Sequence, residues 1–275
     1  GLEEIGVLLD EVGFDAINTA SLTGRAEETA AQNALGILAK LTYPGRVYAC
    51  GGLEYDRPGS TKETLDLAGQ VRDLMAAGFD GMKMIEGKPT TRKMWGIPLD
   101  DPVYDAYYAL LEAEQIPAVY HVADPARFWD PERCSESARK RGWYYGDGTY
   151  PSKEQLHREV DSFMSRFPKL RIIFAHFYFH AYSVEAARRF LDSWENVNFD
   201  LTPFGEMYLQ FTPEREAWRE FFIEYQDRIV LGTDLSAPGW HPDAAGVAGF
   251  VGDIRRFLEK TEPYEAFGGE VRGLG

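Results

Sequence analysis

The stretch IPAVYHV, residues 116–122, is a short apolar run that contains a histidine near its end. A segment of helical pattern, residues 102–114, comes directly before it. A strand that is apolar on both faces is typical of a parallel sheet covered by helices. The stretch therefore predicts an α/β fold in which His121 lies at the carboxyl end of a strand.

The same alternation of strand and helix extends along the chain in both directions. Strand-like segments begin near residues 14, 46, 79, 116, 171, 197 and 228, and helical patterns separate them. Strict alternation predicts a parallel sheet with helices outside it. No G-x-G-x-x-G turn follows an early strand, which argues against a doubly wound nucleotide-binding fold. We therefore predict a single (β/α)8 TIM-barrel domain over residues 1–275 that lacks its first strand and is truncated at both ends.

The composition excludes several classes of protein. Acidic residues outnumber basic ones 44 to 29 among 275 residues, for a net charge of −15, which argues against a nucleic-acid binder. No apolar run approaches the ~20 residues of a membrane-spanning helix. The two cysteines, Cys50 and Cys134, form no C-x-x-C motif and indicate thiols in a cytoplasmic protein. The expected partner is a small-molecule substrate, and assembly into a homo-oligomer stays open.

Polar residues at the ends of the predicted strands indicate where chemistry takes place. His121, His176 and Asp234 each follow a strongly apolar run. In barrel enzymes the carboxyl ends of the strands carry the active site. Neutral imidazoles with a carboxylate are typical ligands of Zn²⁺ or a similar divalent ion. Taken singly, each of these residues could equally be a hydrogen-bonded support or a helix cap.

Five motifs, taken together, resemble the amidohydrolase superfamily. Within it the chain is similar to amidohydrolase family 2, which includes decarboxylases related to aminocarboxymuconate-semialdehyde decarboxylase. The resemblance covers nearly the whole chain and rests on the order and spacing of the motifs. They are FDGMKM (79–84), PLDDP (98–102), IPAVYH (116–121), IFAHF (173–177) and LGTD (231–234).

The resemblance implies a role for each strand-end residue. His121 matches a metal ligand, and His176 matches a residue that binds the metal or polarises the substrate. Asp234 matches a metal ligand that is also the acid–base group. The implied cofactor is a divalent ion, Zn²⁺ with Mn²⁺ or Fe as alternatives. The family also has a His-x-His pair on its first strand, whereas no two histidines of this chain are two apart. We interpret the absence as truncation; a true loss would put metal binding in doubt.

Three functions remain open at this point. The first is a metal-dependent hydrolase that activates water to cleave a small amide, ester or lactone. The second is a non-oxidative decarboxylase that acts on an aromatic or unsaturated carboxylic acid at the same site. It would be favoured if Arg92, Arg127 or Arg133 gripped a carboxylate. The third is a non-catalytic or metal-independent barrel.

An aromatic insertion over residues 124–150 follows the strand that ends near His121. Loops after barrel strands build the pocket and its lid, although the insertion could also be a small satellite core. Asp200 is expected to be a hydrogen-bonding support, and His241 to lie in a surface loop. The residues expected to contact the substrate are Lys83, Trp95, Trp129, Arg133, Tyr145 and His180.

Overall fold

The computed structural model describes residues 2–57, 59, 61–235 and 244–275 of the chain. His241 therefore lies outside the described residues. The chain divides into two compact units. The first unit consists of Thr19–Leu38 and Ala49–Phe174, and the second of Gly1–Asn18, Ala39–Tyr48 and Ala175–Gly275.

Seven strands alternate with helices along the described chain, and the predicted α/β fold is confirmed. These strands are β1 (Ile17–Ala20), β2 (Val47–Gly51), β3 (Gly81–Gly87), β4 (Ala118–Val122), β5 (Ile172–Phe174), β6 (Val197–Asp200) and β7 (Ile229–Val230). Two further strands, β8 (Pro263–Ala266) and β9 (Gly269–Arg272), form an antiparallel hairpin.

The helices begin and end where local signals place them. Ser152 caps one helix by accepting a hydrogen bond from the backbone N–H of Gln155, and Gly78 ends another in a left-handed conformation. The helices of the described chain are α1 (Leu2–Asp10), α2 (Ala26–Thr42), α3 (Leu67–Ala77), α4 (Pro89–Trp95), α5 (Asp105–Glu114), α6 (Glu136–Lys140), α7 (Lys153–Arg166), α8 (Val184–Ser193), α9 (Met207–Phe211), α10 (Arg215–Glu224) and α11 (Ala244–Glu259).

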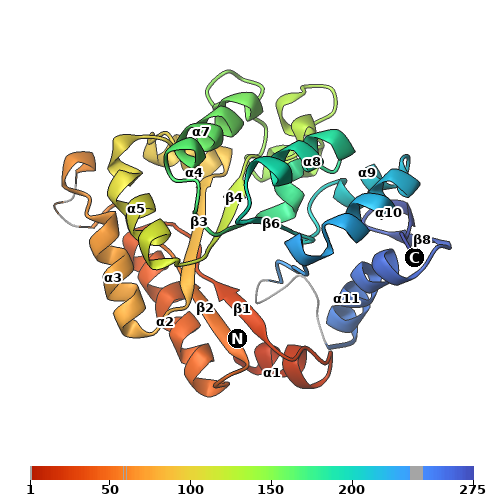
Figure 1. Cartoon of the computed structure of the whole chain (residues 1–275), viewed down its shortest axis with the longest axis horizontal. Helices are drawn as coiled ribbons and strands as arrows, with labels where there is room; N and C mark the ends of the chain where they lie inside the picture. Colours follow the sequence, from red (N-terminus) through yellow and green to blue (C-terminus); the bar gives the residue numbers. More distant parts are fainter. Residues whose placement is uncertain (1, 58, 60, 236–243) are drawn as a thin grey trace. The chain divides into compact units, whose positions relative to one another are not determined.

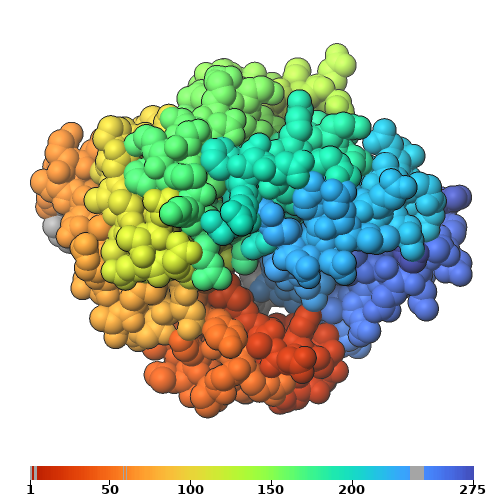
Figure 2. Space-filling view, viewed as in Figure 1, coloured from red at the N-terminus to blue at the C-terminus, as the bar shows by residue number. Residues whose placement is uncertain are grey.

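In the first unit, β2 to β5 pair in parallel and in the order of the sequence. Lys83 of β3 pairs with Val119 of β4, and Val119 pairs in turn with Ile173 of β5. Helices α3 and α5 lie beside the β3–β4 pair in Figure 1 and reach the surface in Figure 2. Most residues of β3 and β4 are buried, as expected for strands covered on both faces.

A β-bulge interrupts β3 near its carboxyl end. Met84 pairs with Tyr120 and Gly87 with Val122, so β3 advances by one residue more than β4. The carboxylate of Glu86 accepts the backbone N–H of Ile85 at 2.7 Å, which satisfies a donor within the bulge. The bulge leaves no room for a side chain at Gly87, because a Cβ there would lie 2.7 Å from the carbonyl oxygen of His121.

We expect the substitution Gly87→Ala to lower the free energy of unfolding by about 1–3 kcal/mol, because the methyl group would collide with the β4 backbone. Urea denaturation measures the change. Gly249→Ala in α11 is the matched control, since no atom lies within 4 Å of a Cβ there. It should raise the free energy of unfolding by about 0.5–1 kcal/mol. Equal effects of the two substitutions would contradict the tight fit at Gly87.

In the second unit, β6 and β7 pair in parallel, with Asp200 opposite Val230. The carboxyl end of β6 lies against an aromatic core. The ring of Phe177 packs 4.8 Å from Phe199 and 5.6 Å from Trp218, measured between ring centroids. This core supports the segment that carries His176.

Two strands are shorter than their sequences predict. The strand predicted over 171–177 ends at Phe174, and the strand predicted over 228–234 is reduced to Ile229–Val230. The backbone turns left-handed at four successive residues, His176 to Phe179. The reason at His176 is a hydrogen bond, because its backbone N–H donates to the carboxylate of Asp200 at 2.7 Å.

Two predictions about the chemistry of the chain can also be compared with the structure. Cys50 and Cys134 are both buried and form no disulfide with each other. Among the described residues, no helix is both long enough and apolar enough to span a membrane.

Candidate functional site

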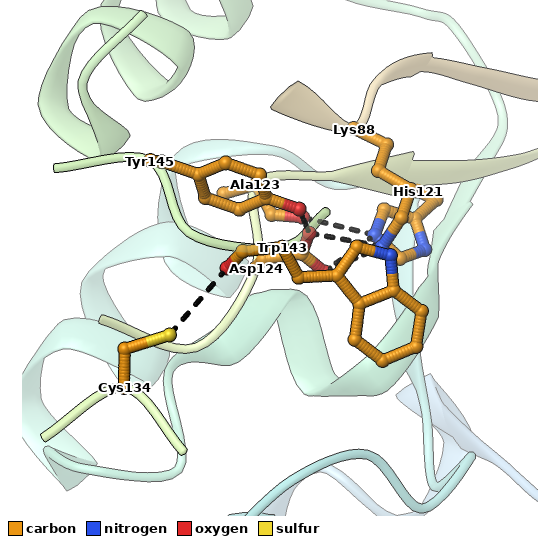
Figure 3. A network of polar contacts seen from close by, with 7 residues as sticks. All are labelled: Lys88, His121, Ala123, Asp124, Cys134, Trp143 and Tyr145. Carbon is orange, nitrogen blue, oxygen red and sulfur yellow. Dashed lines mark hydrogen bonds and ion pairs between the residues drawn. The ribbon is translucent and has the colours of Figure 1, made fainter. Parts of the chain in front are cut away.

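The carboxyl end of β4 places a histidine and an aspartate together in the first unit (Figure 3). His121 is 5% exposed and Asp124 is fully buried. Between them, Ala123 has a φ of 65°, a left-handed conformation that residues with a Cβ rarely adopt. This turn brings the carbonyl oxygen of Ala123 to 2.9 Å and the carboxylate of Asp124 to 3.3 Å from Nε2 of His121.

These two acceptors determine the tautomer of His121. A carbonyl oxygen can only accept a hydrogen bond, so Nε2 carries the hydrogen and Nδ1 carries the lone pair. Burial lowers the pKa of His121, and the nearby ammonium groups of Lys88 and Lys83 lower it further. The imidazole is therefore held in its neutral form, which can ligate a metal or accept a proton.

The carboxylate of Asp124 is the centre of a buried polar network. Nζ of Lys88, at the end of β3, lies 2.9 Å from both of its oxygens, and the hydroxyl of Tyr145 donates to Oδ2 at 2.6 Å. Burial alone would raise the pKa of Asp124, but Lys88 and the hydrogen bonds outweigh burial, and the pKa lies below its usual value. Asp124 is therefore an ionised carboxylate that joins the ends of β3 and β4 to the aromatic insertion.

The insertion packs on itself through its rings. The backbone N–H of Tyr145 donates to the carbonyl of Phe128 at 2.8 Å, and the rings of Phe128 and Trp143 stack 5.9 Å apart. Lys88 also lies over the ring of Trp143, with Nζ 4.9 Å from its centroid. Lys88 thus contacts both Asp124 and the insertion (Figure 3).

In the second unit, His176 is held by two hydrogen bonds. Nδ1 of its ring lies 3.2 Å from the carbonyl oxygen of Thr202, so Nδ1 carries the hydrogen and Nε2 the lone pair. Its backbone N–H donates to Asp200, and the backbone N–H of Thr202 donates to the same oxygen at 3.0 Å. Asp200 thus acts as a hydrogen-bonding support, as the sequence predicts.

Asp234 follows β7 in the second unit. Its side chain is exposed, and its φ of 51° is left-handed. The chain is tightly packed at Gly232, two residues before Asp234. A Cβ on Gly232 would lie 2.1 Å from the hydroxyl oxygen of Thr202. Asp234 thus lies four residues beyond the end of β7.

Three of the predicted substrate contacts are buried. Lys83 lies within β3, and its charge acts on His121. The hydroxyl of Tyr145 donates to Asp124. His180 is packed among aromatic rings of the second unit, 4.9 Å from Tyr178 and 5.8 Å from Phe190.

The other three predicted contacts are more exposed. Trp129 donates its Nε1 hydrogen to the carbonyl of Pro151, and Trp95 is half-buried at the end of α4. The side chain of Arg133 is exposed. Two further arginines were considered for gripping a carboxylate. Arg92 pairs with the buried carboxylate of Glu159, and Arg127 lies over the ring of Phe128.

Lys88 and Thr202 are two residues of the site that the motifs do not indicate. The spacing of Asp124 three residues after His121 was visible, but nothing local indicates that Lys88 reaches it. Thr202 contributes only its backbone, which any residue could supply. The one available signal for Lys88 was its position directly after a strand, in the sequence Gly87-Lys88-Pro89.

Each of the two histidines suits a metal ion as a ligand. A ligating imidazole is neutral and donates its other ring N–H to a carbonyl or carboxylate, and both His121 and His176 have this arrangement. Within residues 2–235 and 244–275, apart from residues 58 and 60, no cluster of three or more histidine, cysteine, aspartate or glutamate side chains could hold an ion.

Comparison with known proteins agrees with the motifs. A sequence model described as amidohydrolase matches residues 25–262, which is most of the chain. No curated protein matches the chain.

Solved structures share the fold at low sequence identity. An uncharacterised TIM-barrel protein from Bordetella bronchiseptica has 14% identity and a TM-score of 0.57, over 93% of this chain and 75% of that one. A 2,6-dihydroxybenzoate decarboxylase from Rhizobium has 16% identity and a TM-score of 0.55, over 90% of this chain and 80% of that one. A 5-carboxyvanillate decarboxylase from Novosphingobium aromaticivorans has 16% identity and a TM-score of 0.56, over 92% and 73%. That structure contains manganese and 4-hydroxy-3-methoxy-5-nitrobenzoic acid. At these identities the likeness shows the TIM-barrel type of α/β fold.

Proposed function

Since the chain belongs to the amidohydrolase family, as its motifs predicted, we propose that it is a metal-dependent decarboxylase of a small aromatic or unsaturated carboxylic acid. The observation that carries this proposal is the positive charge around His121. Lys83 within β3 and Lys88 directly after β3 are both buried, and both lower the pKa of that histidine.

Buried positive charge favours a negatively charged substrate over a neutral one. A carboxylate would gain from the potential of Lys83, because the charge of Lys88 is already paired with Asp124, whereas a neutral amide, ester or lactone would gain nothing. Two of the structural relatives are named for decarboxylation of aromatic acids, which supports the same substrate class. Arg92 pairs with Glu159, Lys88 pairs with Asp124, Arg127 lies over the ring of Phe128, and Arg133 is exposed. We therefore assign recognition of the carboxylate to Lys83.

The proposal keeps the ligand set that the motifs imply, namely His121, His176 and Asp234. When bound, a divalent ion, Zn²⁺ with Mn²⁺ or Fe as alternatives, would supply Lewis-acid polarisation of substrate oxygen atoms. The carbonyl of Thr202 holds His176 with the lone pair on Nε2, which would serve as a ligand for the ion. Asp234 would hold the proton delivered to the carbon atom as its bond to the departing carbon dioxide breaks.

Residues that surround the carboxylate would then give specificity. Among the predicted contacts, Trp95 and Trp129 supply flat apolar surface, and Lys83 supplies charge. His180 and Tyr145 are buried, so we propose that they support neighbouring residues. Arg133 would reach only a substrate group that extends towards solvent.

We expect the purified protein, supplied with Zn²⁺ or Mn²⁺, to release carbon dioxide from at least one member of a panel of aromatic and unsaturated carboxylic acids. Lactones, esters and amides of similar size serve as the matched panel and should stay intact. Lys83→Met should raise KM for the acid about tenfold, since one charge in a buried site is worth a few kcal/mol at most. Lys93→Met, at an exposed lysine of α4, is the control. Cleavage of neutral compounds alone would identify the hydrolase that the sequence analysis considered first.

A further inference from the structure

A second buried polar cluster in the first unit is centred on Glu86, which is 1% exposed. Its Oε1 accepts hydrogen bonds from the hydroxyls of Thr23 and Tyr55, both at 2.9 Å. Its Oε2 accepts the backbone N–H of Ile85 in the bulge. Thr23 follows β1, Tyr55 follows β2 and Glu86 is near the end of β3. The carboxyl group of Glu86 therefore links the segments that follow β1 and β2 to the end of β3.

Tyr55 connects this cluster to a tryptophan. Its ring stacks on Trp95 with centroids 5.2 Å apart and planes 25° apart, and its hydroxyl lies 3.1 Å from that of the buried Tyr104. Trp95 is half-buried, and its Nε1 hydrogen has no acceptor in the described part of the chain, although the atom is buried. A buried indole N–H normally has an acceptor. The pair thus offers a flat ring and an unused donor.

We propose that Glu86 is a positioning residue, which holds the buried Tyr55 behind Trp95 so that the indole of Trp95 is a flat surface for the ring of a planar carboxylic acid. The indole N–H of Trp95 would donate to an oxygen of that acid. This inference rests on the proposed function and extends it, because it names the planar part of the substrate and three residues that recognise or support it.

The chemistry of Glu86 provides a matched pair of substitutions. Burial raises the pKa of Glu86, and its hydrogen bonds lower it by less. The three hydrogen bonds that it accepts can be tested by substitution. In Glu86→Gln, the amide oxygen can accept from Ile85 while the amide N–H groups donate to the hydroxyls of Thr23 and Tyr55. Glu86→Leu has a similar size but makes none of these bonds.

Calorimetric titration of the whole protein with benzoate and with cyclohexanecarboxylate tests the inference. The two probes share a carboxylate, and only benzoate is planar. The unmodified protein should prefer benzoate about three- to tenfold, the range expected for an aromatic contact. Glu86→Gln should keep this preference within twofold, and Glu86→Leu should lose it. His157→Ala, in α7 and outside this cluster, should keep it.

Trp95→Leu keeps the test decisive if Glu86→Leu does not fold, because it alters a half-buried residue and should abolish the preference. Equal affinity of the unmodified protein for the two probes would overturn the inference. So would a folded Glu86→Leu or Trp95→Leu variant that still prefers benzoate. Release of carbon dioxide without any preference for benzoate would leave the proposed function standing and refute this inference alone. A preference for benzoate without release of carbon dioxide would support the planar binding surface and refute the proposed decarboxylase function.

Discussion

Substitution of Asp124 by alanine is expected to lower the free energy of unfolding by about 3–5 kcal/mol, as for other buried ion pairs that lose one partner. The carboxylate accepts two contacts from Lys88, one from Tyr145 and one from His121. Without it, the buried ammonium group of Lys88 and the buried hydroxyl of Tyr145 both lose a hydrogen-bond acceptor. Urea denaturation at neutral pH, where Asp124 is ionised, measures the loss.

Two variants show whether the loss comes from the network. The double substitution Asp124→Leu with Lys88→Met should recover most of the stability, because neither charge then remains buried. Tyr145→Phe removes one hydrogen bond to an ionised group and should cost about 1.5–3 kcal/mol. An Asp124→Ala variant within about 1 kcal/mol of the unmodified protein would show that the network contributes little.

His176→Ala is expected to have the largest effect on catalysis. We expect kcat/KM to fall by about 10²–10⁴, the range for loss of a residue that handles a proton or polarises the substrate. The reason is the fixed orientation of the ring, whose Nδ1 donates to the carbonyl of Thr202. Steady-state kinetics on the acid that releases carbon dioxide measures the effect.

His157→Ala is the matched control, because His157 lies within α7 and not at the end of a strand. It should leave kcat/KM within about threefold, as expected for a substitution outside the site. Both variants should have the same circular dichroism as the unmodified protein. A similar fall in both variants, or in neither, would remove His176 from the proposed mechanism.

The fold could be predicted because the alternation of periods is a local property. Every one of the seven strands was found within a few residues, since apolar runs and helical spacing are visible along the chain. The predicted ends of the strands were less accurate than their positions. β5 stops at Phe174 because the next residues hydrogen-bond to Asp200, 24 residues further along the chain. The hairpin β8–β9 was missed, although Gly268-Gly269 was a turn signal.

The candidate site was only partly visible for the same reason. His121 and His176 follow apolar runs, so their positions could be predicted from the neighbouring residues. The partners of Asp124 could not, because Lys88 and Tyr145 are 36 and 21 residues away from it. The bulge at Ile85 and Glu86 also depends on the register with β4. Tyr145 is expected to contact the substrate, and the sequence gives no sign that its hydroxyl also donates to Asp124.

The metal content of the whole protein tests the proposed function most directly. Protein purified without chelator, or dialysed against Zn²⁺ or Mn²⁺ and washed, should contain about one divalent ion per chain by elemental analysis, as single-ion sites of this type do. The His176→Ala variant should contain clearly less, and His157→Ala the same amount. An unmodified protein that holds no stoichiometric ion and gains no activity from added Zn²⁺ or Mn²⁺ would contradict the proposal.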